Sequence, residues 1–157
     1  MFECRIITPE FFKTAPCIFV SECEVPATPE ALFKIFEDEN SWPVWVAGID
    51  KVEWTTPRPF GVGTKRTVTL GGGLIVNELF LAWEPGKRMT FCFTSANQKI
   101  WSAFGEDYVV TDLGNGRSKL RWTVAFEPCG VYRWIMKVAA PGMRWWGSAA
   151  MAFFCSA

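Results

Sequence analysis

The stretch "VPATPEALFKIFEDENSWPVW" (25–45) predicts a helix at its centre. Thr28 can cap the first turn, because its hydroxyl oxygen can accept a hydrogen bond from a free backbone N–H group. Pro29 suits the first helical position, and the carboxylate of Glu30 favours the positive end of the helix dipole. Apolar side chains then recur at helical spacing and predict one buried face, which is formed by Leu32, Phe33 and Phe36.

The residues on either side of this helix predict its neighbouring elements. Asn40 and Pro43 end it, because a proline cannot continue a helix interior, and "SWPVWV" (41–46) predicts a second, short helical turn. Before the helix, "CIFVSECEV" (17–25) alternates apolar and polar residues, which is typical of a strand. Residues 1–16 predict an irregular N-terminal segment.

The remainder of the chain predicts strands and then a helix. The strand pattern is clearest where Leu120, Trp122, Val124 and Phe126 share one face, and the short links between strands predict antiparallel hairpins. Residues 131–157 have helical spacing, interrupted at Pro141. We therefore predict an α+β fold in which a bent antiparallel sheet of about seven strands packs against a long C-terminal helix. After the short helices, the predicted strands are 49–55, 63–70, 74–83, 88–95, 100–113 and 117–128.

This order of segments resembles the START-like helix-grip (SRPBCC) superfamily, and within it the polyketide cyclase/dehydrase and lipid-transport family. The resemblance covers about residues 17–157 and implies a single ligand-binding domain over 1–157. It also implies that the sheet curls around the last helix and leaves a cavity that opens near the early helices. It implies no particular reaction. The segments that carry it are "ATPEALF" (27–33), "WPVW" (42–45), "GVGT" (61–64), "WEPGKRMTF" (83–91) and the apolar C-terminal helix.

The composition argues against several classes of protein. Sixteen basic and sixteen acidic side chains show no basic face, so no nucleic-acid partner is expected. No segment has the roughly 18 uninterrupted apolar residues of a membrane span. The six cysteines lack CxxC spacing and histidine is absent, so we expect no metal site and no cofactor. The even number of cysteines allows disulfides. Because no signal peptide is found, we instead expect a cytoplasmic protein whose cysteines are reduced and act as small buried hydrophobic residues.

Aromatic side chains are frequent, with fourteen Phe, nine Trp and two Tyr among 157 residues. They either fill an ordinary core or form the wall of an apolar cavity. For the second arrangement, we expect Trp45 at the mouth of the cavity, Trp42 partly exposed and Trp54 at the margin of the sheet. The predicted ligand-binding residues are Phe33, Trp45, Asn77, Leu79, Leu81, Phe91, Phe93, Trp101, Tyr108, Trp122, Met143, Trp146, Ala150 and Phe153.

Few polar residues fall on the predicted apolar faces. By strand alternation Glu106 and Tyr108 share a face, and burial in the cavity would raise the pKa of Glu106 and make this pair candidate catalytic residues. A position at the rim would instead leave Glu106 in water. Asn77 is predicted to point inward and Glu78 to be solvated. Arg66 either binds an anionic head group inside or is a solvated charge at the sheet edge.

Three functions fit these patterns. The first is the binding of a small hydrophobic or amphipathic molecule, such as a lipid, a sterol or a polyketide-like compound. The second is an enzyme of the polyketide cyclase, aromatase or dehydratase kind, and the sequence leaves open whether the protein catalyses a reaction. Without histidine, Ser-His-Asp and Cys-His nucleophilic sites are excluded. The third is contact with a partner, including a second copy in a homodimer, through Phe153 and Phe154.

Overall fold

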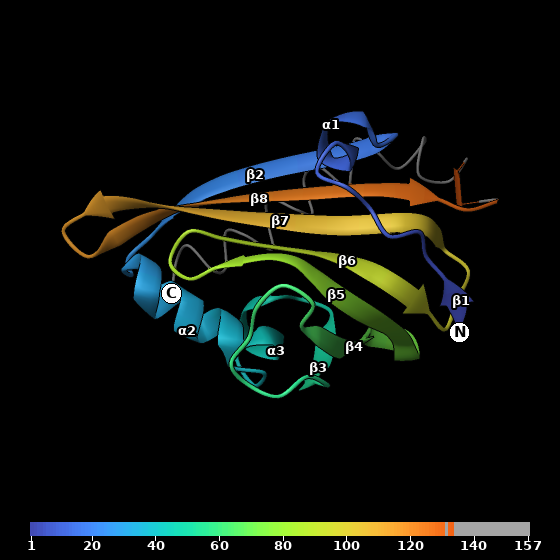
Figure 1. The fold of residues 1–157 in the computed structure, drawn as a ribbon, viewed down its shortest axis with the longest axis horizontal. Helices are drawn as coiled ribbons and strands as arrows, with labels where there is room; N and C mark the ends of the chain where they lie inside the picture. Colours follow the sequence, from blue (N-terminus) through green and yellow to red (C-terminus); the bar gives the residue numbers. More distant parts are fainter. Residues whose placement is uncertain (131, 134–157) are drawn as a thin grey trace.

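The computed structural model of the chain describes residues 1–130, 132 and 133 (Figure 1). The predicted C-terminal helix therefore lies, apart from two residues, outside the described part. The elements in chain order are β1 (Phe2–Glu3), α1 (Phe11–Thr14), β2 (Cys17–Val25), α2 (Pro29–Glu37), α3 (Trp42–Trp45), β3 (Ile49–Trp54), β4 (Lys65–Leu70), a 3₁₀ turn (Gly71–Gly73), β5 (Leu74–Glu84), β6 (Arg88–Ala96), β7 (Trp101–Gly114) and β8 (Arg117–Pro128).

The strands form one antiparallel sheet in the order β2-β8-β7-β6-β5-β4-β3, and β1 pairs with β6. From β3 to β8 each strand pairs with the next one along the chain, as the short links predict. The exception is β2, which pairs along its whole length with β8, so that Cys17 faces Phe126 and Val25 faces Ser118. The predicted α+β class and the seven-stranded antiparallel sheet are confirmed, with β1 as an added short strand.

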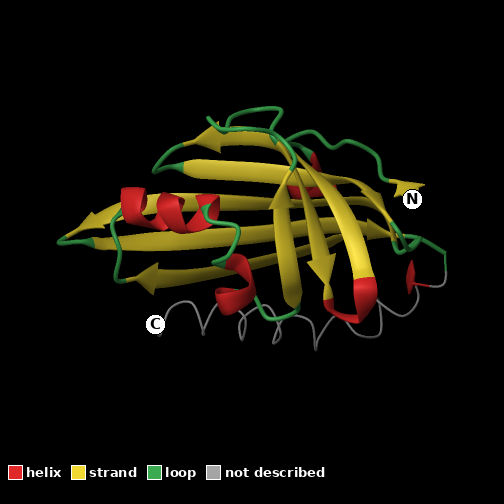
Figure 2. Cartoon of the chain, turned by 90° about the horizontal axis from the view of Figure 1, so that it is seen from below, coloured by secondary structure: helices red, strands yellow, loops and turns green. Residues whose placement is uncertain are grey.

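The sheet is strongly bent, and its bend creates an inner and an outer face. Figure 2 shows one group of strands running nearly across the direction of the others. Register shifts interrupt the pairing of β5 with β6 between Asn77 and Glu78 and between Phe80 and Ala82. Bulges of this kind increase the local twist and allow a sheet to curl. Helices α2 and α3 come after β2 in the chain and lie beside one end of the sheet (Figure 1).

Helix α2 forms as its sequence predicts. The Thr28 hydroxyl accepts a hydrogen bond from the Ala31 backbone N–H at 3.2 Å, and Pro29 begins the helix. The predicted apolar face is buried, because Leu32, Phe33 and Phe36 are at most 3% exposed. Burial of this face against the sheet, rather than helix propensity, stabilises a helix of only nine residues.

The short helix α3 is held against α2 by two hydrogen bonds to carbonyl groups in the last turn of α2. The Ser41 hydroxyl donates to the Ile35 carbonyl at 2.5 Å, and the Trp42 indole N–H donates to the Phe36 carbonyl at 3.0 Å. These contacts turn the Trp42 ring inward, where it is 1% exposed. The expectation that Trp42 is partly exposed is therefore wrong. The aromatic character of the loop could not reveal this, because the cause is the carbonyl end of α2.

The first sixteen residues are more ordered than the sequence suggests. They contain β1 and α1, and they cover the outer face of the sheet with a second, small core of Ile7, Phe11, Cys92, Ala103 and Ala125. Gly105 in β7 permits this close approach, since a Cβ atom there would lie 2.2 Å from Ile7 Cδ1 and 3.1 Å from the Phe91 carbonyl oxygen. Both faces of the middle strands are thus apolar.

Two further expectations can be compared with the described residues. In that part of the chain, no helix has the length and apolar character needed to cross a membrane. Cys4, Cys17, Cys92 and Cys129 are free thiols, whereas Cys23 is disulfide-bonded. The expectation of reduced cysteines is therefore wrong for Cys23.

Candidate ligand cavity

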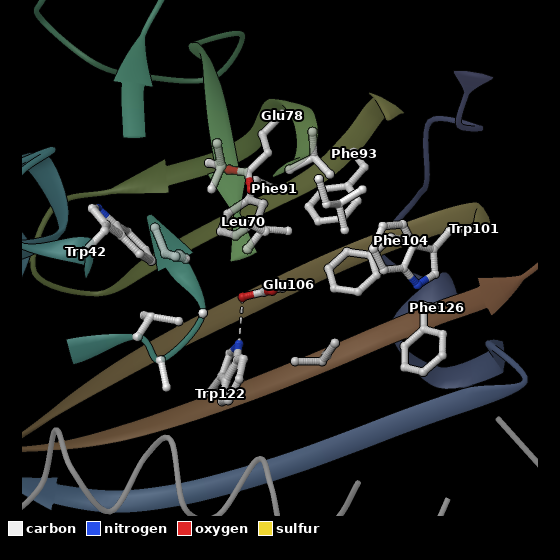
Figure 3. Close-up of a pocket in the computed structure, with 18 of the residues that line it drawn as sticks. Trp42, Leu70, Glu78, Phe91, Phe93, Trp101, Phe104, Glu106, Trp122 and Phe126 are labelled. Atoms are coloured by element: carbon white, nitrogen blue, oxygen red, sulfur yellow. Dashed lines mark hydrogen bonds between the residues drawn. The ribbon is translucent and has the colours of Figure 1, made fainter. Parts of the chain in front are cut away.

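A cavity of about 430 Å³ lies on the inner face of the sheet. Its wall comes from the inner faces of β2 and β4 to β8, together with α3 and the residues just after it (Figure 3). The aliphatic part of the described wall is formed by Val46, Ala47, Ile49, Val68, Leu70, Leu74, Val76 and Val124. The aromatic part is formed by Phe19, Trp42, Phe91, Phe93, Trp101, Phe104, Tyr108, Trp122 and Phe126.

Aromatic rings on neighbouring strands stack on one another and form a continuous wall. Phe19, Phe126, Phe104 and Phe93 succeed one another across β2, β8, β7 and β6, and the Phe93 and Phe104 ring centroids are 4.1 Å apart and nearly parallel. Ring pairs of this kind are favourable beyond the area they bury. The rings therefore stabilise each other within the sheet and need not meet across the hollow.

Glu106 on β7 is the polar centre of one side of the cavity. Its Oε2 atom accepts a hydrogen bond from the Trp122 indole N–H at 2.9 Å (Figure 3) and another from the Tyr108 hydroxyl at 2.6 Å. Tyr108 and Trp122 are direct neighbours across β7 and β8, which brings both donors to the same carboxylate. Burial raises the pKa of Glu106 to about 7, although the two hydrogen bonds oppose this shift. Glu106 is thus half-buried in the cavity wall and bonded to two side chains, rather than fully in water as at a rim position.

Tyr108 is held in its protonated form by the same surroundings. Burial raises its pKa well above the ordinary value, and the nearby Glu106 carboxylate raises it further. A phenol in this position can donate a hydrogen bond but does not ionise near neutral pH. The pair thus consists of a fixed donor and a carboxyl group whose proton is exchangeable near neutral pH, which is what general acid–base chemistry requires.

Arg66 and Glu78 form a buried ion pair on another side of the cavity. They are direct neighbours across β4 and β5, and Arg66 Nε donates to Glu78 Oε2. The guanidinium carbon lies 4.0 Å from the ring centroid of Trp42 and 4.7 Å from that of Phe91. Burial raises the pKa of Glu78, and the charge of Arg66 opposes this. The predicted solvation of Glu78 is wrong, and Arg66 is 1% exposed rather than a solvated edge charge.

The structure brings some of the predicted ligand-binding residues together and separates others. Phe91, Phe93, Trp101, Tyr108 and Trp122 all contribute to the cavity wall. Phe33 and Trp45 are buried in the core that surrounds the wall, next to Trp83 and Trp42 respectively. Four predicted residues lie outside the described part of the chain: Met143, Trp146, Ala150 and Phe153.

The prediction for β5 has the wrong face inward. Asn77, Leu79 and Leu81 lie on the outer face, where Leu79 and Leu81 pack against the small core beneath α1. Asn77 accepts a hydrogen bond from Thr67 at 2.8 Å and donates one to Ser95 at 3.0 Å. Because the N-terminal segment covers the outer face, both faces of β5 are apolar and the alternation of the sequence does not distinguish them.

Several wall residues were missed by sequence reasoning. Phe104 and Phe126 had a signal, since they share a strand face with Tyr108 and Trp122 respectively. Phe19, Ser21, Trp42 and Glu78 had none that separates a cavity wall from an ordinary strand or loop, and the inward alternative for Arg66 is the one that the structure shows. Across the described residues, no cluster of His, Cys, Asp or Glu side chains is arranged to hold a metal ion.

Comparison with known proteins places the chain in a family. Residues 16–153 match the family described as polyketide cyclase/dehydrase and lipid transport, and the chain belongs to it. An uncharacterized protein of Mycobacterium tuberculosis (strain ATCC 25618 / H37Rv) is 39% identical over 141 residues, which are 90% of this chain and 84% of that protein. An uncharacterized protein of Mycobacterium bovis has the same identity and coverage.

Solved structures share the fold at low sequence identity. A START superfamily protein from Mycobacterium smegmatis matches with a TM-score of 0.67 and 13% identity over 88% of this chain and 97% of its own. The Zhui aromatase/cyclase from Streptomyces sp. R1128 matches with a TM-score of 0.61 and 13% identity over 73% of this chain and 69% of its own. The predicted START-like (SRPBCC) membership is thereby confirmed.

Proposed function

We propose that residues 1–157 form one domain that binds a small hydrophobic or amphipathic molecule in the cavity of the bent sheet. The observation that carries this proposal is a hollow of about 430 Å³ whose wall is aromatic and aliphatic except for a few buried polar groups. Ligand sites commonly have this size and this composition. Membership of a polyketide cyclase/dehydrase and lipid transport family supports the same function.

Burial of apolar surface supplies the driving force for binding in such a site. A ligand that buries about 300 Å² of apolar surface gains roughly 7 kcal/mol at 25 cal/mol per Å². Loss of translational and rotational freedom opposes this gain. The stacked rings reduce that cost on the protein side, because they are already ordered in the free wall.

Native mass spectrometry of gently purified protein, together with organic extraction, tests the proposal directly. We expect an added mass that extraction removes. Val124→Trp would place an indole in the cavity, because Val124 lies in its wall, and should abolish the added mass. Val109→Trp is the matched control, since Val109 alternates with Tyr108 and Val110 and lies outside the wall. If Val124→Trp retained the compound and Val109→Trp lost it, binding in this cavity would be contradicted.

A second function is favoured by one specific observation, the buried Glu106–Tyr108 pair in the cavity wall. A carboxyl group with a pKa of about 7 can give or take a proton at neutral pH, and Tyr108 lies beside it as a fixed donor. These are suitable groups for an enzyme of the cyclase, aromatase or dehydratase kind. Once a substrate is found, Glu106→Gln should reduce kcat while binding persists. An unchanged kcat would remove Glu106 from any catalytic role.

A further inference from the structure

Arg66 has a hydrogen-bond donor that the described residues do not use. The side chain is 1% exposed, and its Nε atom is engaged by Glu78. Its Nη1 atom is buried and has no hydrogen-bond partner among the described residues. A buried donor without an acceptor is costly, and more so when it is charged. Because Arg66 is part of the cavity wall, an oxygen atom of a bound molecule can supply the missing acceptor.

The charges around Arg66 indicate what kind of oxygen this is. The guanidinium is already neutralised by Glu78, and a second carboxyl group, Glu106, lines the same cavity. Figure 3 shows the Glu78 and Glu106 side chains turned toward one space. The described wall contains no other Arg or Lys. A ligand carboxylate would thus lose its hydration on entering the cavity and would find no unpaired cation there to form an ion pair, which is unfavourable. An uncharged oxygen avoids this cost.

We propose that the cavity selects uncharged molecules that carry a carbonyl-type oxygen, and that this oxygen accepts a hydrogen bond from Arg66 Nη1. This proposal rests on the ligand-binding function proposed above. Ketones, aldehydes and esters with an apolar body fit this description. Fatty acids and other free carboxylates do not. The aromatic wall accommodates the apolar body, whereas the Arg66–Glu78 pair orients the polar end.

Three probes of nearly equal shape test this selectivity. Acetylnaphthalene is a ketone and carries the carbonyl oxygen. In isopropenylnaphthalene a methylene group stands in place of this oxygen. In naphthoate a charged oxygen stands in place of the methyl group of the ketone. Binding is measured by isothermal titration at about pH 8.5, above the pKa of Glu106 of about 7. We expect the ketone to bind roughly tenfold more tightly than isopropenylnaphthalene, the effect of one hydrogen bond to a charged donor. Naphthoate should bind more weakly than the ketone.

Two variants locate the effect. Arg66→Met combined with Glu78→Gln removes both charges together, and should abolish the preference for the ketone over isopropenylnaphthalene. Glu106→Gln leaves Arg66 in place and removes a carboxylate from the wall. It should improve naphthoate binding relative to the ketone, and this expectation can be tested even if the double variant does not fold.

Each pattern of results has a distinct meaning. Equal binding of the ketone and isopropenylnaphthalene by the unmodified protein would overturn the role of Arg66 Nη1 while leaving a ligand cavity in place. Naphthoate binding as tight as that of the ketone would overturn the charge selectivity. If none of the three probes bound and no compound co-purified, the proposed function would fail, and this inference with it.

Discussion

The buried carboxyl group of Glu106 should make the stability of the protein depend on pH in a defined direction. Its pKa rises from an ordinary value of 4.5 to about 7 on folding. The folded state therefore holds the proton more tightly than the unfolded chain. The free energy of unfolding should fall as pH rises from about 4.5 to about 7 and should be level above that. This interval, at 1.36 kcal/mol per pH unit, corresponds to about 3 kcal/mol.

Glu106→Gln isolates this contribution, because glutamine cannot ionise but can still accept hydrogen bonds from Tyr108 and Trp122. Urea unfolding monitored by tryptophan fluorescence at about pH 5 and about pH 8 gives the free energy for each protein. Between about pH 5 and about pH 8, the free energy of unfolding of the variant should rise by about 2.5 kcal/mol relative to that of the unmodified protein. Glu78 is present in both proteins, so its own titration largely cancels in the comparison.

An exposed glutamate provides the matched control. The hydrogen bond to Lys119 lowers the pKa of Glu22 in the folded protein. Any stability that Glu22 contributes is therefore lost only when the pH falls below the pKa of this side chain in the unfolded chain. Glu22→Gln should therefore leave the difference between the same two pH values unchanged. If Glu106→Gln also produced no pH-dependent difference, the burial of that carboxyl group in the cavity wall would be refuted.

Two further substitutions test the packing that positions the cavity. Gly105→Ala should lower the free energy of unfolding by about 1–3 kcal/mol, because the new methyl group would meet Ile7 and the Phe91 carbonyl; an unchanged urea midpoint would contradict the close approach of the N-terminal segment. Thr28→Ala should cost about 1 kcal/mol through loss of the α2 cap, measured by the same assay, with Thr28→Ser as the variant that retains stability.

Local residue patterns predict the elements after residue 16 in the described part of the chain, and their order. Thr28 and Pro29 begin α2 because their chemistry satisfies a local need of the backbone, and no distant residue is required for this. The alternation in β8 likewise predicts a face that carries Trp122, Val124 and Phe126, because only one face of that pattern is apolar. These signals also carried the resemblance to the family that the comparisons confirm.

Which side chains meet in the cavity depends instead on contacts between residues far apart in the chain. The N-terminal segment covers the outer face of β5 and buries Leu79 there, so that Glu78 lies on the face that points into the cavity. Arg66 and Glu78 look like surface charges in the sequence, and only the register of β4 with β5 shows that each neutralises the other. The volume of the hollow depends on the bend of the whole sheet. Burial and pairing arise from long-range contacts, and local residue patterns do not encode them.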